Sequence, residues 1–322
     1  MGDHRDIIDI AVWAADSQLP TLAALREVPS IRVQSLGGES NDARRFAEQH
    51  TLDFVDDPRL LAMGDARAVL IMNPAASMED EIVQAMAAAA RQQGRTLFSL
   101  IPRPGLDIGD AERRSPESRP VPVPCFSDTT AGRRFTDAAS AFGRPLTASI
   151  DVTGADGDPL LHARLFDAID TLAPWFGLPA RVQATAVYDD EAPSRPMRRL
   201  LAQLSFADGR AASIAVGTAP GALQRDVALQ GDAGRLAYSE GRTTWRSVDG
   251  RDLESGGAQD AAAPSLAEQI AEAVAWHVGG ASRSRDHDTW EGMMAACEAV
   301  LLSARTGNAE VVDSVRRMLG RV

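Results

Sequence analysis

Short apolar runs that alternate with helical segments over the first ~120 residues constrain the fold of this chain more than any other feature. The apolar runs lie at residues 7–13, 31–36, 66–72 and 95–101, and the helical segments lie near 19–25, 41–50 and 77–92. The run at 66–72 is almost continuously apolar, as expected for a strand buried on both faces. This alternation predicts an α/β fold whose first part is a Rossmann-like, doubly wound parallel sheet.

A proline-rich stretch from Pro102 to Pro124 interrupts this pattern and is typical of a connection between domains. Beyond it, a single helix over 160–176 precedes a series of strands, and Asp208-Gly209 is a strong hairpin signal between two of them. The expected strands lie at residues 146–152, 182–188, 200–206, 211–216 and 226–230, followed by an exposed loop over 247–263 and helices from 265 and from 289 to 305. We therefore expect a Rossmann-like domain over 1–122 and an α+β domain over 123–322 with a mostly antiparallel open sheet.

The charge and composition of the chain argue against several classes of binding partner. The formal net charge of −12 argues against broad binding to nucleic acid or anionic lipid. No apolar run approaches the ~18 residues of a membrane span. Cys125 and Cys297 are far apart, which argues against a disulfide framework or a zinc site. We expect a cytoplasmic protein that binds no metal, no nucleic acid and no membrane.

All 33 basic residues are arginine, and the chain contains no lysine. Because the arginine guanidinium stays protonated up to a pH of about 12, it neither shuttles a proton near neutrality nor forms a Schiff base. This chain therefore cannot use a catalytic mechanism that requires a lysine side chain.

Several stretches resemble the Gfo/Idh/MocA oxidoreductases, the group of glucose–fructose oxidoreductase and inositol dehydrogenase. DIAVWAADSQLPTLAAL resembles the family's first strand–turn–helix, and ARAVLIMNP resembles the strand beside the nicotinamide. LLHARLFDAIDTLAPWFGLPARVQATA resembles the active-site helix and the strand after it. LAQLSFADGRAASIAV resembles the central hairpin, and EAVLLSARTG resembles the last helix. The resemblance implies NAD or NADP as cofactor, a sugar or polyol substrate, and a homo-oligomer formed through the second domain's sheet.

The cofactor motif of that family is degenerate here. Where the family has Gly-x-Gly-x-x-Gly after its first strand, this chain has Ala14, Asp16 and Leu19, with Ser17 in the same turn. The Asp16 carboxylate would occupy the helix N-terminus at which a pyrophosphate binds. We expect Asp16 to be a helix N-cap or a first-turn acid instead.

The other cofactor positions implied by the resemblance also depart from the family. Gly37 stands where an acid would hold the adenosine ribose, and Glu39 is the nearest substitute. Asn73 follows the strand expected beside the nicotinamide. The family's Glu-Lys-Pro tripeptide matches Leu100-Ile101-Pro102, in which only Pro102 is kept.

The active-site helix of the family carries an Asp, a His four residues later and an Asp three residues after that. The matching residues are Ala163, Asp167 and Asp170, and His162 lies one residue out of register. Asp167 and Asp170 are spaced i, i+3 and share a helix face, so they form either an acid–base pair or, as we expect, a solvated acidic face. We expect His162 to be a partly buried or solvent-facing residue of this helix.

Three functions remain open. The chain could be a non-catalytic homologue that serves binding or assembly, alone or beside an active homologue, and we rank this pseudoenzyme hypothesis first. It could instead be an active NAD(P)-dependent oxidoreductase with an altered cofactor mode. A third possibility is a lyase or hydrolase that uses His162, Asp167 and Asp170 on a sugar-like ligand.

Overall fold

The computed structural model describes residues 7–72, 80–102, 120–154, 158–188, 197–219, 223–256, 264–280 and 287–319. These residues form two compact units, each described below by itself. Unit 1 contains the elements up to residue 124 together with one later helix, and unit 2 contains the remaining elements.

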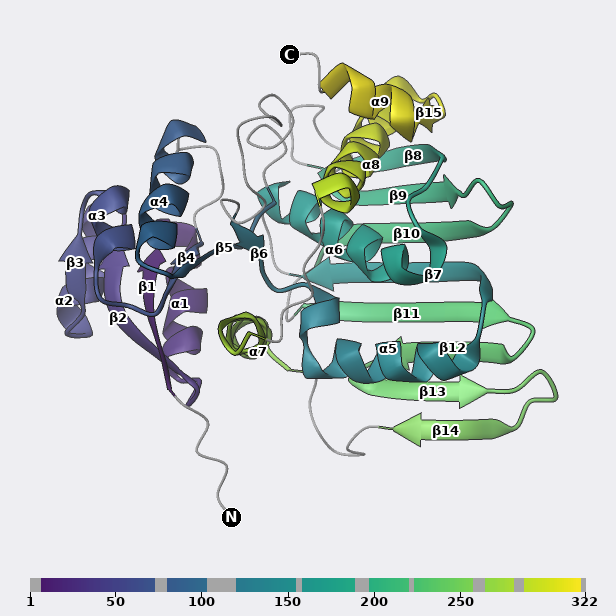
Figure 1. The fold of residues 1–322 in the computed structure, drawn as a ribbon, viewed down its shortest axis with the longest axis horizontal. Coiled ribbons are helices and arrows are strands. Elements are labelled where there is room, and N and C mark those ends of the chain that lie inside the picture. The colour runs from purple at the N-terminus through teal and green to yellow at the C-terminus, as the bar shows by residue number, and fades with distance from the viewer. Residues whose placement is uncertain are drawn as a thin grey trace. The chain divides into compact units, whose positions relative to one another are not determined.

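Unit 1 is built on a parallel sheet with the strand order β3-β2-β1-β4-β5-β6 (Figure 1). Its strands are β1 (Ile8–Trp13), β2 (Ile31–Gly37), β3 (Asp53–Val55), β4 (Ala68–Ile71), β5 (Thr96–Ser99) and β6 (Val121–Pro122). Its helices are the short 3₁₀ helix η1 (Asp16–Gln18), α1 (Leu19–Arg26), α2 (Asn41–Gln49), α3 (Pro58–Met63), α4 (Asp80–Gln92) and α7 (Leu266–Val278). The order of the strands reverses between β1 and β4, so the carboxyl ends of these two strands form the topological switch point at which such sheets usually bind ligands.

Both faces of this sheet are buried, as the apolar runs predicted. Along β1, Ile10 and Val12 pack into one core cluster with α1 and α7, whereas Ala11 and Trp13 pack into a second cluster with α3 and α4. The predicted doubly wound sheet is therefore confirmed.

Helix α7 belongs to unit 1 although it lies more than 140 residues after β6 in the sequence. It contacts α1 and β5, and its apolar face, which includes Ile270 and Val274, is fully buried in the first core cluster. The sequence predicted a single domain boundary, after residue 122. The structure instead returns the chain to unit 1 because this helix covers a sheet face that would otherwise be exposed.

Unit 2 is built on a mixed sheet with the strand order β14-β13-β12-β11-β7-β10-β9-β8-β15, in which only β7 and β10 pair in parallel. Its strands are β7 (Pro145–Gly154), β8 (Arg181–Tyr188), β9 (Met197–Ser205), β10 (Ala211–Thr218), β11 (Gln224–Gly231), β12 (Gly234–Ser239), β13 (Arg242–Arg246), β14 (Asp252–Gly256) and β15 (Glu310–Val311). Its helices are the 3₁₀ helix η4 (Phe126–Asp128), α5 (Thr130–Phe142), α6 (Asp158–Phe176), α8 (His287–Thr306) and α9 (Val312–Leu319). The predicted α+β architecture with a mostly antiparallel sheet is confirmed.

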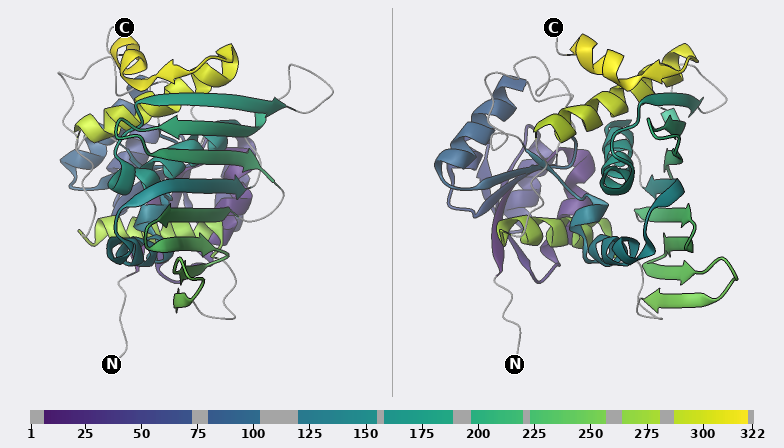
Figure 2. Two further views of the ribbon diagram at one scale, coloured as in Figure 1. Left: turned by 90° about the vertical axis from the view of Figure 1, so that its right-hand side faces the viewer. Right: turned by 45° about the vertical axis from the view of Figure 1, so that its right-hand side comes forward.

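One face of this second sheet is covered by α5, α6 and α8, and its other face is not covered by any of the described helices of unit 2 (Figure 2). The strands alternate between buried and exposed residues, as in β9, where Leu200, Ala202 and Leu204 are buried and Leu201 and Gln203 are exposed. Alternation of this kind is what a sheet packed on one face requires.

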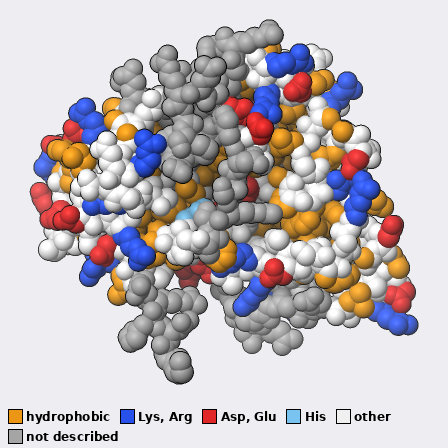
Figure 3. Space-filling view, in the orientation of Figure 1, with side chains coloured by type: hydrophobic (Ala, Val, Ile, Leu, Met, Phe, Trp, Pro, Cys, Tyr) orange, Lys and Arg blue, Asp and Glu red, His pale blue; other side chains and the backbone are white. Residues whose placement is uncertain are grey.

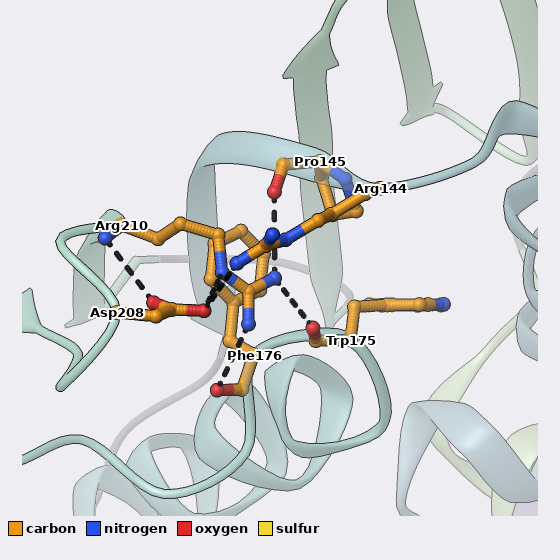
Figure 4. A network of polar contacts seen from close by, with 6 residues as sticks. All are labelled: Arg144, Pro145, Trp175, Phe176, Asp208 and Arg210. Atoms are coloured by element: carbon orange, nitrogen blue, oxygen red, sulfur yellow. Dashed lines mark hydrogen bonds and ion pairs between the residues drawn. The ribbon is translucent and has the colours of Figure 1, made fainter.

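Arg210 of the β9–β10 hairpin contacts the C-terminal end of α6. The Arg210 guanidinium donates to the Trp175 carbonyl (2.7 Å) and the Asp208 carboxylate (2.6 Å), with longer contacts to the carbonyls of Phe176 and Pro145 (Figure 4). It also lies 4.6 Å from the centre of the Phe176 ring. A positive charge at a helix C-terminus satisfies carbonyls that have no partner inside the helix.

The sequence patterns did not predict β3, α3, α5, β12, β13, β15 and α9. They also did not predict β6, which pairs with β5 from within the stretch 102–124 that was expected to be only a connection. The predicted exposed loop over 247–263 is wrong at Asp252–Gly256, which forms the edge strand β14. The predicted helix start at Ser77 lies outside the described residues, and the hairpin at Asp208-Gly209 is confirmed, with Gly209 at a φ of +83°.

None of the described helices is long and apolar enough to cross a membrane. In the view of Figure 3, basic and acidic side chains are interspersed over the described part of the surface.

Candidate functional site

The turn after β1 begins the candidate cofactor site of unit 1. The Ala14 N–H donates to the Gly37 carbonyl (2.9 Å), which ties the end of β1 to the end of β2. Ala14 is buried, whereas Asp16 and Ser17 are exposed in η1. The N-cap of η1 is Ala15, and no side chain caps η1 or α1. The expectation that Asp16 is an N-cap is therefore wrong, and its place in the first turn of η1 is confirmed.

The Asp16 carboxylate makes a different contact, because it accepts a hydrogen bond from the Ser40 hydroxyl. Ser40 is the N-cap of α2, and its Oγ also accepts from the Ala43 N–H (3.0 Å). A carboxylate–hydroxyl bridge therefore joins the loops that follow β1 and β2, and a negative charge lies in the turn where a Rossmann fold binds a pyrophosphate.

The position that the resemblance assigns to the ribose-binding acid has no room for a side chain. A Cβ at Gly37 would lie 2.3 Å from Trp13 Cε3 and 2.9 Å from the Val55 carbonyl oxygen. The buried Trp13 ring therefore fills this space. Glu39, the nearest acid, is exposed two residues further along.

At the carboxyl end of β5, the residues matching the family's Glu-Lys-Pro are apolar and buried. Leu100 is 4% exposed and Ile101 is 5% exposed, and both belong to the core cluster of unit 1. The Ser99 hydroxyl accepts from the Ile101 N–H (3.2 Å) and donates to the Ile101 carbonyl (2.9 Å). Pro102 is buried next to them, and Asn73 lies outside the described residues.

In unit 2, the two acids of α6 lie in the protein interior. Asp167 is 3% exposed and Asp170 is 6% exposed, so the expected solvated acidic face is wrong. The Asp167 carboxylate accepts from Arg225 Nε (2.6 Å) and from the Phe126 N–H (2.5 Å). Asp170 accepts from the Ser127 hydroxyl (2.7 Å).

Electrostatic effects at Asp167 oppose each other. Burial, together with the nearby Asp170 charge, raises the pKa of its carboxyl by more than the Arg225 charge and the Phe126 N–H lower it, so the net shift is upward. We assign the ionised form because both contacts are donors at short distance and one of them carries a full positive charge. A carboxylate engaged on both oxygens in this way is a poor proton acceptor.

His162 belongs to a separate environment on the same helix. Its side chain is 15% exposed, and its Nε2 lies 3.8 Å from Glu298 Oε1 of α8 without a hydrogen-bond partner. Burial lowers the pKa of His162 to about 4, and burial raises the pKa of Glu298. The histidine is therefore neutral at pH 7, and its partial burial agrees with the prediction.

The three α6 residues thus have different neighbours, since Asp167 and Asp170 contact β11 and η4 whereas His162 lies beside α8. The sequence analysis did not predict Arg225 as a site residue. The one hint in the sequence is that Arg225 occupies an inward-facing position of β11, where the next inward residues along the strand are apolar. The sequence analysis also did not predict Ser40 and Glu298, for which no local pattern signals a long-range partner. Among the described residues, no three His, Cys, Asp or Glu side chains are placed to hold a metal ion.

The fold of this chain thus consists of a Rossmann-ordered parallel sheet and a large, mostly antiparallel sheet. Solved structures of this fold match the chain over nearly its whole length. GenD2 from gentamicin A biosynthesis, solved in complex with NAD, matches with a TM-score of 0.69 at 16% identity over 97% of this chain and 98% of that one. Apo scyllo-inositol dehydrogenase from Lactobacillus casei matches with a TM-score of 0.64 at 11% identity, over 96% of this chain and 99% of that one.

Biliverdin reductase from Synechocystis sp. PCC 6803, in complex with biliverdin and NADP⁺, matches with a TM-score of 0.59 at 17% identity, over 93% of this chain and 98% of that one. No family model matches the sequence, and no curated protein does. The resemblance to the Gfo/Idh/MocA oxidoreductases is therefore confirmed as a likeness of fold, and identities this low leave the chemistry to the residues of the site.

Proposed function

We propose that this chain is an oxidoreductase-like protein that has lost standard NAD(P)-dependent hydride transfer and acts in binding or assembly. The observation that carries the proposal is the Asp16–Ser40 bridge across the loops after β1 and β2. Two unit charges ~5 Å apart at an effective dielectric of ~20 repel by roughly 3 kcal/mol, which is about two decades in affinity. A pyrophosphate at this turn would have to overcome that repulsion and displace the bridge.

The position of the family lysine supports the same proposal. Ile101 replaces it in the core of unit 1, and no other lysine exists in the chain. A hydroxyl undergoing oxidation must give up a proton, and neither a buried aliphatic side chain nor an arginine accepts it at neutral pH.

The alternative enzyme functions receive less support. Hydride transfer with an altered cofactor mode would need Glu39 to hold the ribose from its exposed position. A lyase or hydrolase would need Asp167 to exchange a proton although both of its oxygens accept hydrogen bonds.

Titration of the purified protein with NAD(H) and NADP(H), by calorimetry and thermal shift, tests the proposal. We expect no binding up to millimolar cofactor. Asp16→Gly and Ser40→Ala are the matched variants, and weak dinucleotide binding by Asp16→Gly alone would identify the carboxylate as the obstacle. Micromolar binding by the unmodified protein would refute the proposal and direct the search to sugar and polyol substrates.

For the assembly role, we propose a homo-oligomer formed through the uncovered face of the unit 2 sheet, with an active homologue as the other possible partner. Val187 and Leu201 are 45% and 43% exposed on adjoining strands of that sheet, at positions that alternate with its buried residues. Exposed apolar groups on an uncovered sheet face favour association.

Light scattering during size exclusion should report a dimer or larger. Leu201→Glu should dissociate it, and Leu60→Glu on α3 of unit 1, where Leu60 is 57% exposed, is the control that should not. A monomer at all concentrations would contradict this assembly.

A further inference from the structure

The first residues of unit 2, Cys125–Thr129, are unusually well buried for a segment that connects a strand to a helix. We call them the opening segment; it contains η4 and leads into α5. Cys125 and Phe126 are each 2% exposed, Asp128 is 1% exposed and Thr129 is 2% exposed. Buried backbone of this kind requires hydrogen-bond partners.

Asp167 of α6 is such a backbone partner, and Asp170 of the same helix binds a side chain of the segment. The Phe126 N–H donates to Asp167 Oδ1 (2.5 Å), and the Ser127 hydroxyl donates to Asp170 Oδ2 (2.7 Å). The i, i+3 spacing presents both carboxylates on one side of α6, and the two donors come from consecutive residues of the opening segment. The spacing of the acids and the spacing of the donors therefore match.

Arg225 of β11 completes the arrangement. Its Nε donates to Asp167 Oδ2 (2.6 Å), and the side chains of this ion pair are 6% and 5% exposed. Its guanidinium carbon also lies 5.8 Å from the centre of the Phe126 ring. Arg225 thus neutralises the buried Asp167 charge and contacts the residue that Asp167 holds.

Packing fixes the same segment from the other side. The Phe126 ring lies 4.7 Å from the Tyr238 ring and 6.1 Å from the Phe135 ring, measured between centroids. A Cβ at Gly132 would lie 1.7 Å from the Phe126 carbonyl oxygen, so the first turn of α5 approaches the segment closely.

From these contacts we infer that Asp167 and Asp170 anchor the opening segment of unit 2 to α6 and β11, and do not act as acid–base groups. The positions where the related oxidoreductases carry active-site residues have here become a structural anchor. The inference goes beyond the proposed function, because it would hold whether or not a dinucleotide binds to unit 1.

The two roles predict different outcomes for Asp167→Asn. An acid–base group can be replaced by its amide with little effect on folding. In an anchor, the amide removes the negative charge that pairs with Arg225 at 2.6 Å, and removing one partner of a buried ion pair lowers the folding equilibrium constant by roughly 150- to 5,000-fold.

The experiment is urea unfolding of the full chain combined with hydrogen exchange of the peptide covering the opening segment. Asp167→Asn should unfold at lower urea and exchange faster in this peptide, whereas Asp137→Asn, an exposed acid on α5, should do neither. The double variant Asp167→Asn with Arg225→Gln should be less destabilised than the sum of the single variants, because it removes both buried charges.

Ser127→Ala keeps the inference testable if Asp167→Asn does not fold. It removes one buried hydrogen bond, so local exchange in the opening segment should rise roughly five- to tenfold. Exchange and stability in Asp167→Asn that equal those of Asp137→Asn would overturn the inference for Asp167, and unchanged exchange in Ser127→Ala would overturn it for Asp170.

Discussion

Replacing His162 with glutamine should make the protein less sensitive to acid. The structure lowers the pKa of His162 from 6.5 to about 4 by burial. In the unfolded chain the side chain takes up a proton below pH ~6.5, but the folded protein resists this down to a pH of about 4. A lowered histidine pKa therefore leaves stability intact above pH 6.5, and stability is lost as the pH falls from 6.5 toward 4.

The size of this effect follows from the difference in pKa. The full shift is equivalent to about 3 kcal/mol, and at pH 5 the unfolded state gains about 2 kcal/mol relative to the folded state. Glu298, 3.8 Å away, acts in the opposite direction. Its raised pKa means that its contribution is present at low pH and is lost as the pH rises. The histidine figure is therefore an upper estimate for the pair.

The assay is urea unfolding, followed by circular dichroism, at pH 7.5 and pH 5. The unmodified protein should lose more stability between these two values than His162→Gln does, by up to about 2 kcal/mol. Glu298→Gln is the matched control, and it should lose at least as much stability on acidification as the unmodified protein. Equal losses for the unmodified protein and His162→Gln would refute the reasoning, because His162 would then titrate alike in both states.

Two further substitutions test the packing. Arg210→Ala should lower the free energy of unfolding by about 2–3 kcal/mol in urea titrations, since the side chain is only 11% exposed and its guanidinium donates to the Trp175 carbonyl at the end of α6. The Arg144 side chain is 67% exposed, so Arg144→Ala should change the free energy of unfolding little. Equal effects of the two variants would contradict this account. Gly37→Ala should destabilise by about 1–3 kcal/mol, because the new Cβ would lie 2.3 Å from Trp13 Cε3. An unchanged melting temperature for that variant would show that the Trp13 ring moves freely.

The sequence predicted the parts of the fold that have a strong local pattern. The β4 strand is an apolar run buried on both faces, and the β9–β10 hairpin has Asp208-Gly209 at its turn. Helix α5 was missed because its sequence, TAGRRFTDAASAF, begins with Thr and Gly after a proline-rich stretch. Strand β14 was missed because Gly, Asp and Ser are poor strand formers and only pairing with β13 makes it a strand.

At the candidate sites, the sequence pointed to particular residues but not to the contacts that their side chains make. It pointed to Asp16, but the Ser40 hydroxyl that binds it comes from a loop 24 residues away. It pointed to Asp167 and treated it as solvated, because burial and the Arg225 partner depend on the packing of β11 against α6. Long-range partners of this kind leave no periodic signal in a single sequence.

Two positions of unit 1 resist the substitutions that the family's way of binding a dinucleotide would need. Trp13 occupies the space that a side chain at Gly37 would need, so an acid would fit at that position only if Trp13 were smaller. Shrinking Trp13 would in turn open a cavity in the core cluster that contains it, at a cost of about 3–5 kcal/mol for a large aromatic. Ile101 is likewise part of a buried cluster, where a lysine would place an uncompensated charge. Under the function proposed above, regaining hydride transfer would therefore require several simultaneous changes, each of which destabilises the fold when made alone.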